Sequence, residues 1–221
     1  MLVVISDTHA TDAHRLRGRT LDAVREADAV IHAGDFYREA VLDDLERETG
    51  AVYGVTGNND DAALRERLPR ERVVGYEGAT LAVRHRSRSG TTGLVMFGRE
   101  RDADLVVFGH SHRPEFDDSG AVPLLNPGSH AQPRGNRPAH AEVTRTTEGL
   151  AGELVTPDGG VFEAFSVPVQ EPEARLGGGS AIGATGGRGP RASPPPESGY
   201  PGRPPGPSPT RGSGGSGLRD R

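Results

Sequence analysis

The chain contains no cysteine, no lysine and no long uninterrupted apolar run. Without cysteine it forms neither disulfides nor thiolate metal sites, so His, Asp and Asn remain as metal ligands. The absence of lysine makes every basic residue an arginine, which either the base composition of the gene or adaptation to salt could explain. The amino terminus lacks a basic segment followed by a long apolar core, so we expect no signal peptide and no membrane span. A cytoplasmic enzyme that binds no membrane is the expectation.

The last 46 residues, from Leu176, differ in composition from the rest of the chain. They include fourteen glycines and nine prolines and almost no large apolar side chain, as is typical of disordered segments. We therefore predict one domain over residues 1–168, large enough for a hydrophobic core, and a disordered Gly/Pro/Arg-rich tail over residues 169–221. The tail could contact RNA or an acidic surface, but a passive extension is the simpler interpretation.

The charge divides at the same place. Residues 1–175 hold 29 acidic residues and 20 arginines, a net charge of −9, whereas the tail holds six arginines and two acidic residues. An acidic domain argues against broad binding of duplex nucleic acid, which requires a basic face. We therefore expect a small molecule as the partner of the domain.

Five short apolar runs each end in polar residues that can bind a metal. The runs cover residues 2–5, 29–31, 52–55, 81–83 and 105–108, and each is typical of a short strand. In an open α/β sheet the ligand lies outside the carboxyl ends of the strands. We therefore expect the polar residues after these runs to meet at one edge: Asp7, His9, Asp35, Asn58, His85, His110 and His112.

His110 and His112 follow the fifth run directly, after Gly109. Two side chains at i and i+2 lie on the same side of an extended chain but about 200° apart on a helix. The pair can therefore serve one site only from a strand end or a loop. Taken alone, it could be a turn with two exposed histidines, and Asp7 or Asp35 alone could be a helix N-cap.

Apolar periodicity predicts alternating strands and helices in the first third of the chain, and hence right-handed parallel crossovers. Helices are predicted over residues 15–27, 39–48, 61–68 and 91–101. Further strands are predicted over residues 72–76, 80–84, 122–125, 141–144, 152–156 and 161–167, the last three antiparallel. Parallel units followed by antiparallel strands suggest two sheets face to face with helices outside.

The motifs Asp7-x-His9, Gly34-Asp35, Gly57-Asn58-x-Asp60, His85 and Gly109-His110-x-His112 resemble, in this order, those of the calcineurin-like metallophosphoesterase superfamily. The turn from Asn126 to Ser129 and the short length resemble its small single-domain phosphodiesterase branch. The resemblance covers residues 1–167 and implies a four-layer α/β/β/α sandwich. Small members of the family that the chain resembles often form dimers or tetramers, so a homo-oligomer is a possible state of this protein.

The resemblance implies a site for two divalent ions. One ion would be held by Asp7, His9 and His112, the other by Asn58, His85 and His110, with Asp35 bridging both. Two such ions lower the pKa of a shared water and hold the phosphoryl oxygens during displacement. Oxygen and nitrogen ligands without thiolate favour Mn(II), with Ni, Co, Fe, Zn or Mg as alternatives.

Two positions depart from the family pattern. At the position of Asn59, many members of the superfamily that this chain resembles have a histidine that helps the leaving group depart. An amide cannot act as an acid in its place. We therefore expect a preference for good leaving groups or an acid from elsewhere. Asn58 and Asn59 are the catalytic candidates, because the amide of Asn58 could also donate to a phosphate oxygen. In the branch that the chain resembles, the fourth motif usually reads His-Gly-His, and here Arg86 takes the place of the glycine. Arg86 either clamps substrate phosphate or points to solvent.

These observations predict a dinuclear-metal-dependent phosphodiesterase that hydrolyses small phosphate esters with a metal-activated hydroxide. A nuclease or a nucleotide pyrophosphohydrolase is one alternative. A non-catalytic scaffold is another, because the family includes a retromer subunit that resembles the enzymes in fold. Of the remaining histidines, we expect His32 to be buried, and His14, His130 and His140 to lie on the surface or in loops.

Overall fold

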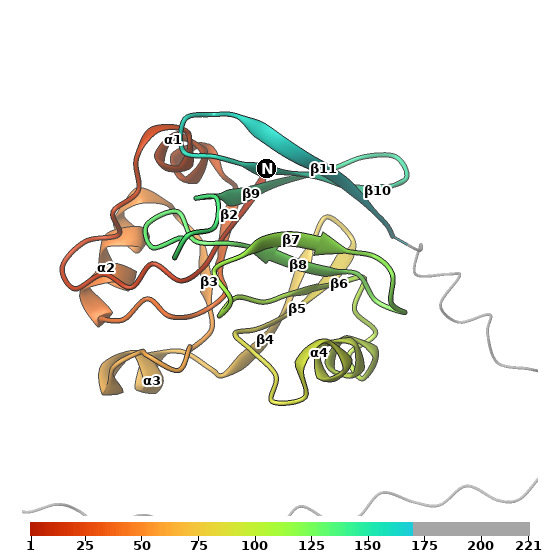
Figure 1. The fold of residues 1–221 in the computed structure, drawn as a ribbon, viewed down its shortest axis with the longest axis horizontal. Helices are drawn as coiled ribbons and strands as arrows, with labels where there is room; N and C mark the ends of the chain where they lie inside the picture. Colours follow the sequence, from red (N-terminus) through yellow and green to blue (C-terminus); the bar gives the residue numbers. More distant parts are fainter. Residues whose placement is uncertain (170–221) are drawn as a thin grey trace, which may run out of the picture. The chain divides into compact units, whose positions relative to one another are not determined.

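Two β-sheets form the centre of the domain in the computed structural model, which describes residues 1–169 (Figure 1). The six-stranded sheet has the order β11-β10-β9-β1-β2-β3, and the five-stranded sheet has the order β4-β5-β6-β8-β7. The strands are β1 Leu2–Ile5, β2 Ala29–His32, β3 Val52–Gly54, β4 Glu71–Tyr76, β5 Ala79–Arg84, β6 Leu105–Val107, β7 Pro114–Asp117, β8 Leu124–Pro127, β9 His140–Arg145, β10 Gly149–Val155 and β11 Val161–Pro168. The helices are α1 Gly18–Glu26, α2 Glu39–Glu48, α3 Ala62–Arg67 and α4 Gly90–Arg99.

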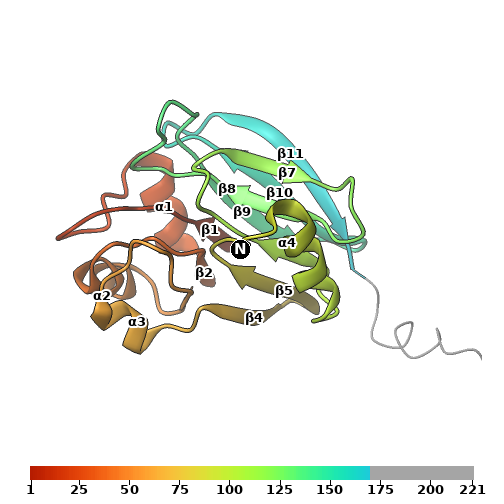
Figure 2. The ribbon, with the colours of Figure 1, turned by 60° about the horizontal axis from the view of Figure 1, so that its bottom comes forward.

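Alternation along β1 explains how the sheets are layered. Leu2 and Val4 pack in the cluster shared with the second sheet, whereas Val3 and Ile5 pack against α1 and α2, as a period of two requires. On the other side, α4 covers β5, β6 and β8 through Leu94, Phe97 and their neighbours. Figure 2 shows α1 and α2 on one side of the domain and α4 on the other. The four-layer α/β/β/α sandwich is therefore confirmed.

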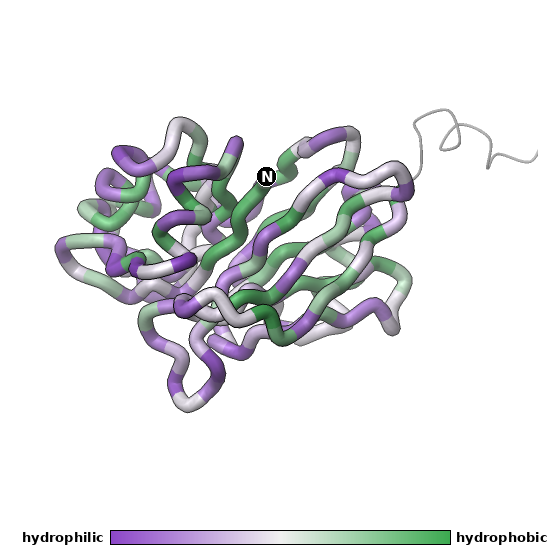
Figure 3. Tube along the Cα trace, turned by 90° about the horizontal axis from the view of Figure 1, so that it is seen from above, coloured by the Kyte–Doolittle hydropathy of each residue, from purple (hydrophilic) through white to green (hydrophobic). Residues whose placement is uncertain are grey.

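Strand direction brings the predicted polar residues together from both sheets. β1, β2 and β3 are parallel in one sheet, and β5 and β6 are parallel in the other. Coloured by hydropathy, the trace shows hydrophobic stretches along its extended segments, with hydrophilic residues between them and in the connections (Figure 3). The loops after these five strands are therefore the polar part of the fold where a site can form.

Two predictions about the later strands were wrong. The strand predicted over residues 122–125 instead begins at Leu124 and runs through Asn126 and Pro127, which pair with β7. Strand β7 was not predicted, because its sequence Pro-Glu-Phe-Asp has no apolar run and all four residues are half-buried. The predicted tail lies outside the described residues, and within them no helix is long and apolar enough to cross a membrane.

Candidate metal centre

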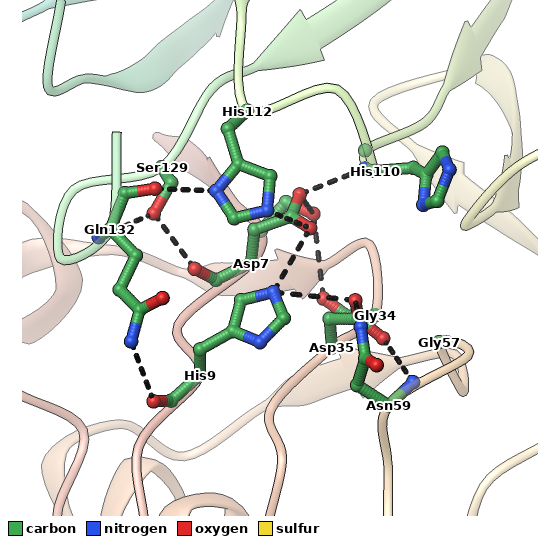
Figure 4. A network of polar contacts seen from close by, with 12 residues as sticks. Asp7, His9, Gly34, Asp35, Gly57, Asn59, His110, His112, Ser129 and Gln132 are labelled. Carbon is green, nitrogen blue, oxygen red and sulfur yellow. Dashed lines mark hydrogen bonds and ion pairs between the residues drawn. The ribbon is translucent and has the colours of Figure 1, made fainter. Parts of the chain in front are cut away.

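Asp7 and Asp35, which follow β1 and β2, form the centre of the site, and both are buried. Asp35 Oδ2 lies 3.3 Å from Nε2 of His9 and 3.3 Å from Nε2 of His85. Asp7 Oδ1 lies 3.3 Å from Nε2 of His112 and 3.7 Å from Nε2 of His9. The two carboxylates thus face histidines that come from three different loops, as Figure 4 shows for those that it labels.

The ligand atoms fall into two groups, each compact enough to hold one ion. Asp7, His9 and His112 form the first, and Asp35, His85 and His110 form the second; within each group the ligand atoms lie within 4.8 Å of one another. Asp35 Oδ2 of the second group lies close to His9 Nε2 of the first group, as is required of a carboxylate that bridges two ions.

Buried atoms without partners test whether these residues fit metal ions. Among the described residues, Asp7 Oδ1, His9 Nε2 and His85 Nε2 are buried and accept or donate no hydrogen bond. A buried polar atom left unpaired costs free energy. All three atoms point into the same space and all three are metal-ligand types, so the residues present fit a pair of divalent ions.

Backbone carbonyls orient two of the histidine rings. His85 Nδ1 donates to Ala33 O over 2.8 Å, and His112 Nδ1 donates to Gln132 O. A ring nitrogen that donates in this way leaves the other nitrogen unprotonated and free to bind a metal. Both Nε2 atoms face the aspartates.

The remaining oxygens of the two aspartates are held by hydrogen bonds. Asp7 Oδ2 accepts from Ser6 Oγ at 2.7 Å and from the backbone N of His110 at 2.9 Å. Asp35 Oδ1 accepts from the backbone N of Asn59 at 2.8 Å, and its Oδ2 accepts from Asn59 Nδ2 at 2.7 Å. These bonds fix each carboxylate and turn Asp7 Oδ1 toward the histidines.

Five of the seven predicted ligands have left-handed backbone conformations. Asp7, His9, Asp35, His110 and His112 have φ between 46° and 74°. Such conformations are uncommon for residues other than glycine, and they gather at functional sites where the surrounding structure imposes them. The hydrogen bonds to both aspartates are part of what holds the loops in this form.

Two glycines allow the loops to approach the aspartates. A Cβ on Gly57 would lie 2.0 Å from Asp35 Oδ1, and a Cβ on Gly109 would lie 2.7 Å from Asp7 Oδ2. Neither distance is tolerable for a side chain, so these positions require glycine for space.

The end of β8 and the turn after it support the site, a role that their sequence did not predict. Asn126 in β8 is fully buried, and its Nδ2 donates to Gly109 O and to Ser111 Oγ on either side of His110. Ser129 Oγ donates to Asp7 O at 2.7 Å and accepts from Gln132 N. The turn therefore joins the loop after β6 to the loop after β1.

Asp60 and His32 form hydrogen bonds that hold the loops after β1, β2 and β3 together. Asp60 is buried and accepts from the backbone N of Gly57 and of Tyr37, which links the loops after β3 and β2. His32 is buried, as predicted; its Nδ1 accepts from Gly34 N and its Nε2 pairs with Thr8 Oγ1. Neither side chain belongs to either ligand group, so both position residues that do.

The pKa values of the aspartates and histidines determine how readily the site binds a metal ion. Burial alone would raise the pKa values of Asp7 and Asp35, but contacts with the neighbouring histidines hold both below the ordinary value. Burial opposes protonation of His9, yet the neighbouring carboxylates of Asp35 and Asp7 raise its pKa to about 9. Burial lowers the pKa values of His110 and His112. The carboxylates are therefore ionised, and His110 and His112 are neutral at pH 7, as metal binding requires. Burial opposes protonation of His85 too, yet Asp35 and Asp7 raise its pKa, so a metal ion would have to displace a proton from His9 and compete with protonation of His85.

Asn58 and Arg86 lie beside the second group. Both are exposed, and with His85 they line an open cleft of about 960 Å³. The charge of Arg86 contributes to the lowered pKa of His110, after burial. The roles assigned to the two residues, as metal ligand and as substrate contact, stay predictions.

Three histidines were expected on the surface or in loops. His14 and His130 lie in loops, whereas His140 begins β9, and none of the three is on the surface, because all are buried. His130 Nε2 pairs with His14 O at 3.0 Å, and His140 contacts Thr20 and Glu142. They belong to the packing between loops and not to the site.

Two groups of aspartate and histidine at the strand ends of a four-layer sandwich are the kind of ligand set that holds divalent ions in metal-dependent hydrolases. The chain belongs to the calcineurin-like phosphoesterase superfamily, whose domain model matches residues 1–149. It is therefore a member of a family of metal-dependent hydrolases of phosphoric esters.

Comparison with individual proteins agrees with this membership. The chain is 34% identical over 139 residues to "Probable metallophosphoesterase MJ0623" of Methanocaldococcus jannaschii, which covers 61% of this chain and 70% of that protein. A solved structure of a Streptococcus pneumoniae protein described as a predicted phosphoesterase is 25% identical, with a TM-score of 0.57 over 75% of this chain and 96% of that one. Vps29 of Entamoeba histolytica, solved with zinc, is 22% identical, with a TM-score of 0.62 over 76% and 99% of the two chains. This last similarity concerns the fold alone.

Proposed function

We propose that this protein is a phosphodiesterase that hydrolyses small phosphate esters with two divalent metal ions, Mn(II) being the first candidate. The observation that carries the proposal is the convergence of three unpaired buried ligand atoms on the space between Asp7 and Asp35. When bound, two ions would supply Lewis acidity and a more acidic water. Asp7, His9 and His112 would hold one, and His85, His110 and Asn58 the other, with Asp35 between them.

The residues themselves supply positioning and charge. Asp35 is fixed by two hydrogen bonds from Asn59, so its carboxylate keeps one orientation during turnover. Arg86 is available to a phosphoryl oxygen from the cleft side, where a guanidinium can bind two oxygens at once. Asn58 lines the same cleft and offers an amide donor.

The leaving group would depart without help from the residue after Asn58. Asn59 is an amide whose side-chain nitrogen donates to Asp35, and it has no proton to give as an acid. The proposed enzyme therefore favours diesters with acidic leaving groups such as aryl oxides. A steep fall in kcat from aryl to alkyl diesters would support this, whereas equal rates would require an acid elsewhere.

The test begins with protein freed of metal by a chelator. Metal content is then measured after Mn(II) is added, together with hydrolysis of bis(4-nitrophenyl) phosphate. We expect about two ions per chain and turnover that depends on them, and we expect Asp35→Asn to remove at least 100-fold of kcat/KM, because it removes the central carboxylate. The far-ultraviolet circular dichroism of the variant controls for its folding.

Two results would contradict the proposal. Binding of metal without metal-stimulated turnover of any diester, monoester or nucleotide would favour a non-catalytic scaffold. Turnover confined to polynucleotides or to nucleotide pyrophosphates would favour the nuclease or pyrophosphohydrolase alternatives. The acidic net charge of residues 1–175 argues against the polynucleotide case.

A further inference from the structure

The cleft beside the second ligand group is lined by five arginines. Thr56, Gly57 and Asn58 form one wall, and the other lining residues are Arg65, Arg70, Glu71, Arg84, His85, Arg86, Ser87, Arg88 and Ser89. His85 and Asn58 thus belong both to this cleft and to the proposed metal site. A ligand in the cleft would extend directly from a phosphate at the metal ions.

The local charge is opposite to that of the domain. Residues 1–175 carry a net charge of −9, yet the only carboxylate among the lining residues is Glu71, and Arg101 pairs with it. Like charges gathered in one place repel one another. A cationic cleft in an acidic domain therefore favours an anionic ligand.

These arginines also differ from others of the domain in their partners. Arg19, Arg25, Arg47 and Arg67 each pair with carboxylates on the surface. By contrast, the exposed side chains of Arg70, Arg86 and Arg88 form no hydrogen bond or ion pair within residues 1–169.

Two other lining arginines are held in place without losing their charge. Arg65 donates to the backbone oxygen of Asn58, and Arg84 lies over the ring of Phe97. Ser87 and Ser89 add hydroxyl groups, and Ser89 precedes α4, whose first turn carries partial positive charge. The cleft thus offers several donors and no unpaired acid.

One phosphodiester would leave most of this charge unused. It carries about one negative charge, and the metal ions and Arg86 would meet its oxygens, which leaves Arg65, Arg70, Arg84 and Arg88 without an anion. A cleft of about 960 Å³ is also far larger than one phosphate, at the upper end of the range for small-ligand sites. The lining and the size together favour a larger and more highly charged substrate.

We propose that the cleft binds a second phosphate group of the substrate, so that the natural substrate is a small phosphodiester bearing a further phosphate on the part of the molecule that lies beside Arg70 and Arg88. This inference rests on the proposed function and names its substrate class. Arginine suits the task because its planar group forms two parallel bonds to phosphate oxygens.

The test uses two substrates that differ by one phosphate. Thymidine 5′-(4-nitrophenyl phosphate) and its 3′-phosphorylated form have the same scissile diester and the same leaving group. For the Mn(II)-loaded full chain we expect kcat/KM to be at least tenfold higher for the 3′-phosphorylated form, since hydrogen bonds to charged groups contribute on this scale. The preference should decrease as salt is raised, because the cleft is open to solvent.

Substitutions locate the second phosphate. The double variant Arg70→Gln, Arg88→Gln should reduce the ratio of the two kcat/KM values about tenfold. The matched control is Arg47→Gln, which removes the same kind of charge from α2, outside the cleft, and should leave the ratio unchanged. A fall in the ratio in the control as large as in the double variant would overturn the inference.

The outcomes separate this inference from the proposed function. Equal hydrolysis of both substrates by the unaltered protein would overturn the inference and leave the phosphodiesterase proposal standing. If neither substrate is hydrolysed, the proposed function fails for them, and calorimetric titration with thymidine 3′,5′-bisphosphate and thymidine 5′-monophosphate decides the inference. It stands if the bisphosphate binds more tightly and the double variant removes the difference, and it falls otherwise. Stronger competition by decathymidylate than by the bisphosphate would overturn the small-molecule assignment in favour of a nucleic-acid strand.

Discussion

Asp35 has more polar neighbours in the site than its predicted role as a bridging ligand required. Its Oδ2 faces His9 and His85, each from a different ligand group, while Asn59 donates to both of its oxygens. Asn59, which stands at the position of the histidine expected from the family resemblance, therefore orients Asp35, a predicted metal ligand. Asn58, its neighbour in sequence, lies in the cleft instead. The two asparagines should for this reason respond differently to substitution.

Replacement of Asn59 by alanine is expected to weaken Mn(II) binding by 10- to 100-fold, the usual range when a group that orients a metal ligand is lost. Replacement of Asn58 removes a predicted ligand, so Asn58→Ala should weaken one of two binding steps and leave the other near its original value. Titration of the metal-free protein against a chromophoric chelator measures both. Asn136→Ala is the control and should bind as the unaltered chain does, because within residues 1–169 the side chain of Asn136 bonds only to Pro133. Unchanged affinity in Asn59→Ala would show that Asp35 does not depend on the amide.

The loop between β3 and α3 is the most tightly packed connection at the site. Gly57 lies against Asp35, with space for a hydrogen but not for a methyl group. Asp60 holds Gly57 N at 2.7 Å, and Asp61 caps α3 by accepting from Leu64 N. Leu64 of α3 is fully buried in the cluster shared with α1 and α2, so the loop is held both by these bonds and by packing of the helix. Enlarging Gly57 should therefore move Asp35.

Gly57→Ala is expected to destabilise the fold by about 1–3 kcal/mol, as overpacking does, and to weaken Mn(II) binding by more than tenfold because Asp35 must shift. Urea unfolding and metal titration measure the two effects. Gly75→Ala in β4 is the matched control, since a Cβ there meets nothing within 4 Å, and it should change neither quantity appreciably. Equal behaviour of the two variants would mean that the close approach at Gly57 has no consequence for the site.

Most elements could be predicted from apolar periodicity, and their ends were less certain. Helix α2 begins and ends where its pattern predicts, at Glu39 and Glu48, whereas α1 begins at Gly18 and not at residue 15. Strand β7 escaped prediction because it is a half-buried edge strand stabilised by pairing with β8. The formation of such a strand depends more on pairing with its neighbour than on its own amino-acid composition.

The ligands were predictable for a different reason from the residues that support them. Asp7 and His112 lie in short motifs at strand ends, so local sequence marks them. Asn126 and Ser129 act through bonds to backbone atoms 17 and 122 positions away, and nothing in their own sequence indicates which backbone they will meet. Their roles follow only from the way the two sheets face each other.

Across the whole domain, buried histidines outside the site connect distant segments. His130 Nε2 bonds to the backbone of His14, 116 positions away, while its Nδ1 is buried without a partner among the described residues. His140 bonds to Thr20 and Glu142, and Glu142 in turn binds Arg19. These contacts hold the loop before α1 and α1 itself against the β8–β9 connection and β9. Protonation of a buried histidine in this region should therefore affect the stability of the entire domain.

Burial lowers the pKa of His130 to about 4, whereas an unfolded chain binds the proton near pH 6.5. Below pH 6.5 the unfolded state takes up a proton that the folded state does not, so the free energy of unfolding should fall as pH decreases from 6.5 to 4, by roughly 3 kcal/mol. Below pH 4 both states are protonated and this contribution stops changing. Urea unfolding at a series of pH values with a chelator present measures the effect. His130→Gln can keep a donor toward His14 and removes the titration, so its stability should vary less across this range. Identical pH dependence in the two proteins would contradict the role of His130 and point to the other histidines whose pKa burial lowers, His32, His110 and His112.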